Sequence, residues 1–361
     1  MGRVASLMLF FATGCSTPPY SKSDHFDGKK FFNPGVKVEK GFLDLVRWKM
    51  AGGVKGWPER LDNREQPKLP HKVATGDAHI TFIGHATHLL QFSSVDQERP
   101  FNVLTDPIFS ERASPVSWAG PKRVRPPGLT INELPPIDVI VVSHNHYDHL
   151  DVASIRAISE RDKTLILVPL GNKKLLKDLP NVEELDWWES RAIGSNVRIT
   201  ATPSQHWSAR GLFDRNEALW SSWVFEAGGV KTLFAGDTGY GPHFKAIRDR
   251  LGLFQLSILP IGAYEPRWFM KEAHMSPEDA LLAWKDLGHP RALGTHYGTF
   301  QLTNEGIDEP ATVLTEGLKL LRAQPSTEDS ASVKTSEFLA PETGETVRYK
   351  GSENHFERSG S

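Results

Sequence analysis

The chain has 361 residues, of which 39% are hydrophobic and 24% are charged, and this composition is typical of a soluble globular protein. Its 42 basic residues nearly balance its 44 acidic residues, which gives a formal net charge of −2. This balance argues against a general affinity for nucleic acid, and the length allows one large domain or two ordinary ones.

The first 15 residues, MGRVASLMLFFATGC, have the pattern of a secretory signal. A positive charge at Arg3 precedes an apolar run over residues 4–12, which is too short to span a bilayer because a spanning helix needs about 20 apolar residues. The string ATGC followed by STPP resembles a bacterial lipobox, which implies lipidation of Cys15. The alternatives are an apolar start without signal function and a misassigned N-terminus. Cys15 is the only cysteine, so no internal disulfide can form.

Composition divides the chain into four parts. Residues 1–15 are the lipoprotein-type signal segment, residues 16–40 are rich in Ser, Pro, Lys and Gly and are predicted to be a tether, and residues 41–349 carry the folded domain. Residues 350–361 lack a periodic apolar pattern and are predicted to be a disordered tail. A lipidated Cys15 implies a place in the bacterial cell envelope, where Ser16 by convention favours the outer membrane and the periplasm. Without a functional signal the protein would be cytoplasmic.

Between the two ends, strand-like apolar runs alternate with helical patterns, which predicts an α/β fold. The predicted strands are residues 78–84, 101–106, 138–144, 164–170, 197–206, 221–227, 231–237, 256–262 and 291–296, with a short last strand near 345–349. The predicted helices are residues 151–160, 171–178, 242–251, 277–287 and 309–323, with a polar loop over 325–337. Ser276 as an N-cap before Pro277 marks one helix start. Gly228 and Gly229 predict a hairpin turn.

Several of the predicted strands end in a side chain that can bind a metal ion. These residues are Asp106, His144, His206, Asp237 and His296. Strand ends on one side of a sheet lie close together in space, so rigid strands can hold such ligands around one point. The sequence therefore predicts a preorganised site at one sheet edge.

The string HNHYDH, residues 144–149, directly follows a strand and reads H-x-H-x-D-H. His144 and His146, two positions apart in an extended segment, point to the same side and can bind one ion. Asp148 and His149 can reach a second ion nearby. Imidazole and carboxylate ligands suit zinc, with iron or manganese as lesser options. The alternative is a histidine-rich surface loop with incidental affinity for metals.

His206, Asp237 and His296 follow that string in the order seen in the metallo-β-lactamase superfamily, which this sequence resembles. The superfamily pattern has seven positions, and all seven are present: His144, His146, Asp148, His149, His206, Asp237 and His296. The resemblance implies a metallo-β-lactamase fold, an αβ/βα four-layer sandwich with a dinuclear metal site at one edge.

Longer strings narrow the resemblance. The segments LTDPIFSERASPVSWAGPKR, PSQHWS, FAGDTGY, PIGAYEPRWFMKEAHMSPEDA and THYGTFQLTNE are similar to those of N-acylphosphatidylethanolamine-hydrolysing phospholipase D. The likeness covers roughly residues 30–320. GAYEPRWFM is its most specific part, because neither folding nor metal binding requires that string. The lipobox and the residues around His206 depart from the family pattern, which puts the preferred acyl chain and head group in doubt.

The resemblance also implies roles for individual residues. It assigns His144, His146 and His206 to one Zn²⁺, and Asp148, His149 and His296 to a second, with Asp237 as the bridging ligand. Asp106 would orient a ligand histidine, with an ordinary turn aspartate as the alternative. His274, beside the family's phosphate site, and Asp148 are the expected catalytic residues. His85 and His88, both placed in one strand, are interpreted as packing residues or as residues that orient ligands.

The function that this resemblance implies is zinc-dependent hydrolysis of a phosphodiester through a metal-bridging hydroxide. The products from N-acylphosphatidylethanolamine would be phosphatidic acid and an N-acylethanolamine. The alternatives are a hydrolase of the same fold acting on a lactone, thioester or cyclic phosphodiester, and a non-enzymatic zinc-binding envelope lipoprotein. The expected partners are a phospholipid substrate and a membrane surface reached through a lipid anchor, without nucleic acid; a homodimer is left open.

Overall fold

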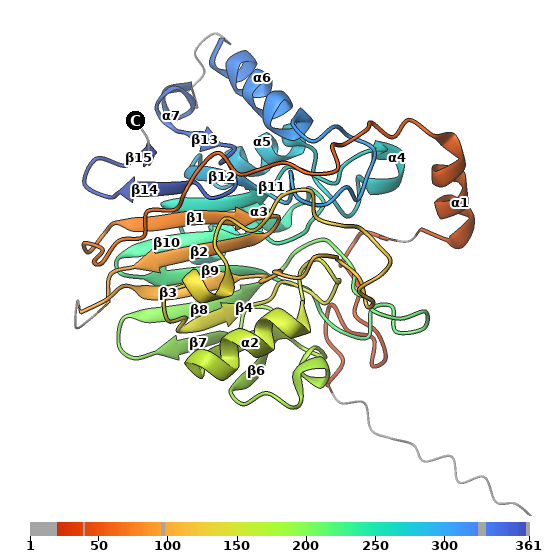
Figure 1. Ribbon diagram of the computed structural model, residues 1–361, viewed down its shortest axis with the longest axis horizontal. Helices are drawn as coiled ribbons and strands as arrows, with labels where there is room; N and C mark the ends of the chain where they lie inside the picture. Colours follow the sequence, from red (N-terminus) through yellow and green to blue (C-terminus); the bar gives the residue numbers. More distant parts are fainter. Residues whose placement is uncertain (1–19, 39, 95–97, 324–329, 359–361) are drawn as a thin grey trace, which may run out of the picture.

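The computed structural model describes residues 20–38, 40–94, 98–323 and 330–358, which form two β-sheets packed face to face with helices outside them (Figure 1). The first sheet has eight strands in the order β15-β14-β1-β2-β3-β4-β5-β6. These strands are β1 (Ala78–Gly84), β2 (Thr87–Phe92), β3 (Phe101–Thr105), β4 (Val139–Val141), β5 (Leu165–Pro169), β6 (Val182–Leu185), β14 (Thr346–Lys350) and β15 (His355–Arg358).

The second sheet has seven strands in the order β13-β12-β11-β10-β9-β8-β7. These strands are β7 (Ser190–Ile193), β8 (Val197–Thr202), β9 (Ser222–Ala227), β10 (Val230–Phe234), β11 (Leu256–Pro260), β12 (Arg291–Thr295) and β13 (Phe338–Leu339). The pairs from β3 to β6 and from β10 to β13 are parallel. Because parallel strands end at the same edge of a sheet, the residues that follow β3, β4, β10 and β12 are brought to one side of the molecule.

The helices lie on the outer faces of the two sheets and at the rim. The α-helices are α1 (Phe42–Ala51), α2 (Val152–Asp162), α3 (His243–Leu251), α4 (Arg267–Met270), α5 (Pro277–Asp286), α6 (Glu309–Ala323) and α7 (Ser330–Thr335). Two 3₁₀-helices cover Ile131–Glu133 and Lys173–Leu176. None of the helices in the described part of the chain is long and apolar enough to cross a membrane.

Three buried apolar clusters hold these layers together. Between the sheets, side chains such as Leu90 of β2 and Phe225 of β9 pack in one cluster. Ile155 of α2 packs on the outer face of the first sheet. Trp284 of α5 packs on the outer face of the second sheet together with side chains of α3 and α6. The order helix, sheet, sheet, helix confirms the predicted αβ/βα four-layer sandwich.

Local sequence signals explain where two of the elements start and turn. The Ser276 side chain accepts a hydrogen bond from the Asp279 N–H, and the Asp279 side chain accepts one from the Ser276 N–H, so α5 begins with the predicted N-cap. Gly228, at the turn between β9 and β10, has a φ of 58°. A Cβ there would lie 2.8 Å from the Ser93 backbone N, so the turn requires glycine.

Both predicted end segments differ from expectation. Phe26 and Phe31, in the segment expected to be a tether, are buried against Trp187 and Trp220. Residues 20–38 are therefore part of the folded body. Strand β15 pairs with β14, so the predicted disordered tail is wrong for residues 355–358. The helix expected at 171–178 is only the short 3₁₀-helix Lys173–Leu176, and α7 lies in the segment expected to be a loop. Residues 1–19, with the signal segment and Cys15, lie outside the described residues.

Candidate metal centre

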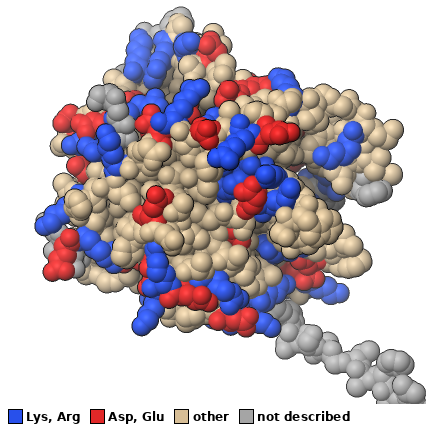
Figure 2. All heavy atoms as spheres, viewed as in Figure 1, with Lys and Arg blue, Asp and Glu red and all other residues tan. Residues whose placement is uncertain are grey.

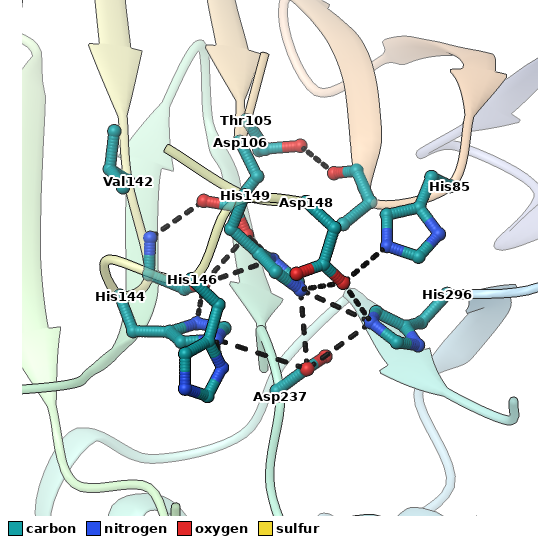
Figure 3. Close-up of polar contacts among 12 residues, drawn as sticks. His85, Thr105, Asp106, Val142, His144, His146, Asp148, His149, Asp237 and His296 are labelled. Carbon is teal, nitrogen blue, oxygen red and sulfur yellow. Dashed lines mark hydrogen bonds and ion pairs between the residues drawn. The ribbon is translucent and has the colours of Figure 1, made fainter. Parts of the chain in front are cut away.

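The loop that follows β4 carries four of the predicted ligands. The loop turns back because the N–H groups of His149 and Leu150 both donate to the His146 carbonyl, at 3.1 and 2.9 Å. The turn separates the four side chains into two groups. His144 and His146 meet His206 in one group, and Asp148 and His149 meet His296 in the other. Figure 3 shows the members of both groups other than His206.

The first group consists of three histidines whose ring nitrogens converge. His144 Nε2 lies 2.8 Å from His146 Nδ1, and His206 Nε2 lies 3.3 Å from the same atom. His144 and His206 follow strands β4 and β8 and are buried. Two opposed sheets therefore supply the three nitrogens.

The second group combines one carboxylate with two of the predicted histidines, and His85 lies within reach of the same point. His149 Nε2 and His296 Nε2 are 3.1 Å apart, and Asp148 Oδ2 lies 3.3 Å from each of them. His296 follows β12 of the second sheet. This group is also assembled from both sheets.

Asp237, which follows β10, lies between the two groups. Its Oδ2 atom is 3.2 Å from both His149 Nε2 and His296 Nε2 in the second group. The same oxygen is 4.0 Å from His144 Nε2 and 3.9 Å from His206 Nε2 in the first group. A single carboxylate oxygen thus faces both sets of nitrogens, the position that a bridging ligand requires. The structure brings all seven predicted residues together.

The donor set fits two cations better than it fits a hydrogen-bond network. A neutral imidazole has one N–H, so three converging ring nitrogens cannot all be satisfied by one another. A tetrahedral zinc ion with Zn–N bonds of about 2.0–2.1 Å would hold its nitrogens about 3.3 Å apart, close to the separations in both groups. Among the described residues, Asp237 Oδ1 is buried and has no hydrogen-bond partner. The site therefore has the donors and the spare acceptor that a dinuclear metal centre would use.

Electrostatics differ between the two groups. Burial lowers the pKa of His144 and His206 well below 6.5 and that of His146 to about 3, so these rings are neutral and can act as ligands at pH 7. Burial also opposes the charged form of His149, but the carboxylates around it outweigh burial and raise its pKa well above 6.5. A cation that binds the second group would displace this proton, because metal ligands must be deprotonated.

Asp106 orients the loop and one of its histidines. Its carboxylate accepts hydrogen bonds from the Ser143 N–H and hydroxyl, both at 2.6 Å, and lies 2.7 Å from His149 Nδ1. His149 therefore turns its Nε2 atom toward Asp237 (Figure 3). His206 is oriented in the same way, because its Nδ1 donates to the Ala273 carbonyl at 2.9 Å. The geometry agrees with the orienting role expected for Asp106.

His85 lies in the turn between β1 and β2, not in a continuous strand as expected. Its Nε2 atom is 2.9 Å from Asp148 Oδ2, so it contacts a predicted ligand directly. Its φ of 56° is left-handed, as are those of Asp106 (35°) and His296 (65°). Left-handed residues other than glycine are unfavourable and gather at functional sites. His88, by contrast, is buried in the core against Phe82, as a packing residue.

His274 stands beside the metal-binding groups at the end of the segment after α4. Its Nδ1 atom is 3.8 Å from Asp237 Oδ2, and its ring is 5.1 Å from that of His206. Arg267 fixes the backbone here by donating to the His274 carbonyl at 3.0 Å. Burial lowers the pKa of His274 to about 4, so the ring is neutral at pH 7 and carries one N–H. It faces the same pocket as His146, Asp148 and Asp237.

A pocket of about 410 Å³ opens onto the metal-binding groups and is mostly apolar. Its walls come from α1, from α4 and from the segment 207–215. The apolar lining residues include Val38, Leu45, Trp48, Trp207, Phe269, Met270, Ala273 and Leu302. Lys40 and Arg215 add two cations to the lining. Helix α1 and Arg215 were not predicted from the sequence as parts of the site; for α1, the apolar residues between Gly41 and Gly52 were the available signal.

Comparisons with known proteins agree with this architecture. Residues 101–297 match the family model described as "Beta-lactamase superfamily domain". The N-acyl-phosphatidylethanolamine-hydrolyzing phospholipase D 1 of Caenorhabditis elegans is 38% identical over 282 residues, which are 73% of this chain and 77% of that protein. The mitochondrial protein of the same name from Saccharomyces cerevisiae is 37% identical over 261 residues, covering 70% of this chain and 53% of the yeast protein.

Among solved structures, a possible metal-dependent hydrolase from Veillonella parvula superposes with a TM-score of 0.57 at 18% identity, covering 74% of this chain and 98% of the other. At that identity the likeness concerns the fold alone. The chain belongs to the metallo-β-lactamase superfamily, in which it is a metal-dependent hydrolase similar over most of its length to N-acylphosphatidylethanolamine-hydrolysing phospholipase D.

Proposed function

We propose that the protein holds two Zn²⁺ ions and hydrolyses the phosphodiester of N-acylphosphatidylethanolamine-type lipids, giving phosphatidic acid and an N-acylethanolamine. The observation that carries this proposal is the convergence of two ligand groups on Asp237 at the floor of an apolar pocket. Relatives at 37–38% identity with that named activity support the choice of substrate. Two zinc ions would supply an activated water and offset negative charge on the phosphodiester.

The protein residues around the metal groups have separate roles in this proposal. His144, His146 and His206 hold one ion, Asp148, His149 and His296 hold the other, and Asp237 contacts both. His85 keeps Asp148 in place through its 2.9 Å contact. The carboxylates of Asp148, which is partly buried, and Asp237, which is buried, are anionic, since neighbouring imidazoles outweigh the effect of burial and hold their pKa values well below 3.8.

His274 is the proposed catalytic residue that contacts the substrate. Its neutral ring lies at the pocket wall, close to the carboxylate that faces both groups. A neutral imidazole can donate a hydrogen bond to a phosphoryl oxygen or pass its proton to the departing alcohol. The Arg267 contact to the His274 carbonyl fixes the segment from which the ring extends.

The pocket and its rim fit a lipid. The apolar walls of α1 and α4 suit an acyl chain, and Lys40 and Arg215 suit the negative charge of a phosphodiester. Arg215 stacks over Trp207 at 4.1 Å, which holds its guanidinium at the pocket wall. Both cations also donate to backbone carbonyls of the pocket walls, Lys40 to that of Trp268 at 3.0 Å and Arg215 to that of Val38 at 2.7 Å.

Apolar side chains project from the surface around this pocket. Leu212 and Phe213, on the same segment as Arg215, are 91% and 88% exposed, and Leu43 and Met50 of α1 are also exposed. The end of the molecule where Figure 1 places α1 is largely tan in Figure 2, with Lys and Arg as the more visible charges. We propose that this face meets the membrane surface, with Cys15 as a lipid anchor in the bacterial cell envelope.

The test compares three substrates on one zinc-loaded preparation: N-acylphosphatidylethanolamine in vesicles, a lactone panel, and the soluble diester bis-p-nitrophenyl phosphate. We expect cleavage of both diesters, phosphatidic acid as a lipid product, and loss of both activities on chelation. Cleavage of lactones alone would overturn the phospholipase assignment and leave only the metal-dependent hydrolase.

A further inference from the structure

Glu305 is a buried carboxylate that contacts none of the predicted metal ligands through its side chain. Its Oε1 atom accepts hydrogen bonds from the N–H groups of Ala263 at 2.6 Å and Tyr264 at 3.3 Å, and Oε2 accepts one from Glu265 at 3.1 Å. Ala263 has a left-handed φ of 60°. Successive N–H groups turned inward around a left-handed residue form a concave anion-binding nest, and here the anion is a side chain of the same protein.

This nest determines where α4 begins. The turn at residues 263–265 leads directly into α4, which carries Phe269 and Met270 into the pocket wall. The Thr303 hydroxyl lies 2.8 and 2.7 Å from the two carboxylate oxygens and steadies the Glu305 side chain. The string GAYEPRWFM therefore has a structural explanation. The N–H groups of its first half bind the Glu305 carboxylate, and its second half forms α4, which lines the pocket.

Asn304, the preceding residue, holds the adjoining wall, which is formed by α1. Its Oδ1 accepts a hydrogen bond from the indole N–H of Trp48 at 2.9 Å, and its Nδ2 donates to the Gly52 carbonyl at 3.0 Å. These contacts fix α1 at Trp48 and at Gly52, which directly follows the helix. The Asn304 carbonyl also accepts from the Lys55 N–H at 2.9 Å, so the chain leaving α1 is fixed as well.

The two walls meet in the lining of the pocket, where one aromatic ring from each packs against the other. The ring centroids of Trp48 on α1 and Phe269 on α4 are 4.9 Å apart, and both side chains line the pocket. Figure 1 shows α1 and α4 standing beyond the ends of the sheets on the same side of the molecule. Asn304 holds α1, and Glu305 holds the turn before α4. Because these two residues are adjacent in the chain, they fix the position of one helix relative to the other.

We propose that Asn304 and Glu305 are positioning residues that set the width of the acyl pocket and so determine the chain length that the enzyme prefers. This inference rests on the proposed function, because it takes the pocket to be the site of an acyl chain. Most of the metal centre is held independently of the two walls, but α4 is linked to it through Arg267, which donates to the His274 carbonyl at 3.0 Å. The backbone next to Gly262 is fixed by β11 and by the hydrogen bond from the Ile261 N–H to the Thr295 carbonyl at 3.0 Å.

The experiment uses Glu305→Gln and Asn304→Asp in the full chain loaded with zinc. Glutamine turns an NH₂ group toward at least one backbone N–H of the nest, and aspartate turns an oxygen toward the Gly52 carbonyl, so each variant loosens one wall. The matched control is Glu345→Gln. Glu345 is also buried, accepts hydrogen bonds from Arg358 and from the Glu342 N–H, and does not line the pocket.

Isothermal titration calorimetry measures binding of a long-chain and a short-chain N-acylethanolamine to each protein. In the wild type we expect tighter binding of the long chain. In Glu305→Gln and Asn304→Asp this preference should fall about tenfold, the scale of discrimination that an apolar pocket achieves. Zinc content should stay at the wild-type level in both variants. Turnover of bis-p-nitrophenyl phosphate should stay at that level in Asn304→Asp, because the wall that this residue holds is α1 and not the α4 segment that carries Arg267. Glu345→Gln should keep the full preference.

An unchanged preference in the folded variants would overturn the inference, and so would a wild type that binds both chains equally. Thermal unfolding is measured first, and Asn304→Asp carries the test if Glu305→Gln does not fold. The proposed function fails separately: a wild type that prefers the long chain but does not cleave N-acylphosphatidylethanolamine would refute the phospholipase activity and leave the role of Asn304 and Glu305 intact.

Discussion

Asn33 and His206 exchange two hydrogen bonds across 173 residues of sequence: the Asn33 side chain donates to the His206 carbonyl at 2.8 Å, and the His206 N–H donates to Asn33 Oδ1 at 3.1 Å. The N-terminal segment thereby holds the backbone of a predicted metal ligand. The segment is itself anchored, because Phe26 and Phe31 are buried against Trp220. Residues before the sheets thus help to build the metal centre.

Replacing Asn33 with Ala should weaken the first ligand group. The change leaves the buried His206 N–H without its partner, which costs about 1–3 kcal/mol of unfolding free energy. Zinc affinity should fall with it. Urea unfolding and zinc competition with a chelator measure the two effects. Asn196→Ala, in the exposed turn between β7 and β8, is the control and should change neither.

Replacing Asp106 with Asn should reduce zinc affinity by about 10- to 100-fold, the usual effect of removing a group that orients a ligand histidine. Asparagine cannot accept from Ser143 and His149 at the same oxygens without placing an NH₂ group against one of them. Metal analysis after dialysis against a graded chelator measures the change. Wild-type zinc retention in Asp106→Asn would show that the carboxylate is only a turn residue.

Replacing His274 with Ala should leave the zinc content intact and lower turnover of the lipid by about 10²- to 10⁴-fold, the range of general acid–base contributions. The residue lines the pocket and is not one of the seven predicted ligands, although it lies close enough to His206 and Asp237 to bind a metal ion with them. Turnover equal to that of the wild type would remove His274 from the reaction. Loss of zinc in the variant would instead make it a ligand.

Because of His25, the free energy of unfolding should depend on pH. Burial acts to lower its pKa, but hydrogen bonds to Asp186 at 2.7 Å and Asp24 at 2.6 Å outweigh burial and raise the pKa above 6.5. A raised pKa means that the folded state favours the proton. The stabilisation is therefore fully present below about pH 6.5 and disappears as the pH rises through the folded-state pKa.

The measurement is the difference in unfolding free energy between wild type and His25→Gln over that pH range. The difference should be large at low pH and shrink at high pH. Metal-site histidines titrate in both proteins, so their effects cancel in the difference. A difference that is constant with pH, or that grows as the pH rises, would contradict the proposed charge on His25.

The elements that could be predicted from the sequence are those marked by a few adjacent residues, such as a helix cap or a pair of glycines. The start of α5 is marked by Ser276 and Pro277, and the hairpin by Gly228 and Gly229, so each could be placed from a few adjacent residues. The predicted metal ligands were found because most of them follow apolar strands. Parallel pairing of several of these strands brings their ends to one edge of each sheet. The strand pattern placed Asp106 at that edge as well, whereas its role in orienting a ligand histidine was implied by the family resemblance.

The parts that escaped prediction depend on distant contacts. The segment 20–38 has the composition of a tether, and its burial comes from Trp187 and Trp220, which lie far away in the sequence. Helix α1 exposes Leu43 and Met50, so its apolar residues do not form the buried stripe by which helices are recognised. His85 was placed in a strand because the tight turn beside it contains no glycine after Gly84 and no proline.

The most direct test of the central claim is hydrolysis of N-acylphosphatidylethanolamine in isotopically labelled water by protein whose zinc content is measured in the same sample. Water that attacks phosphorus should place the label in phosphatidic acid, and two zinc ions should be present per chain. Label in the N-acylethanolamine, release of free fatty acid in place of phosphatidic acid, or full turnover by zinc-free protein would contradict it.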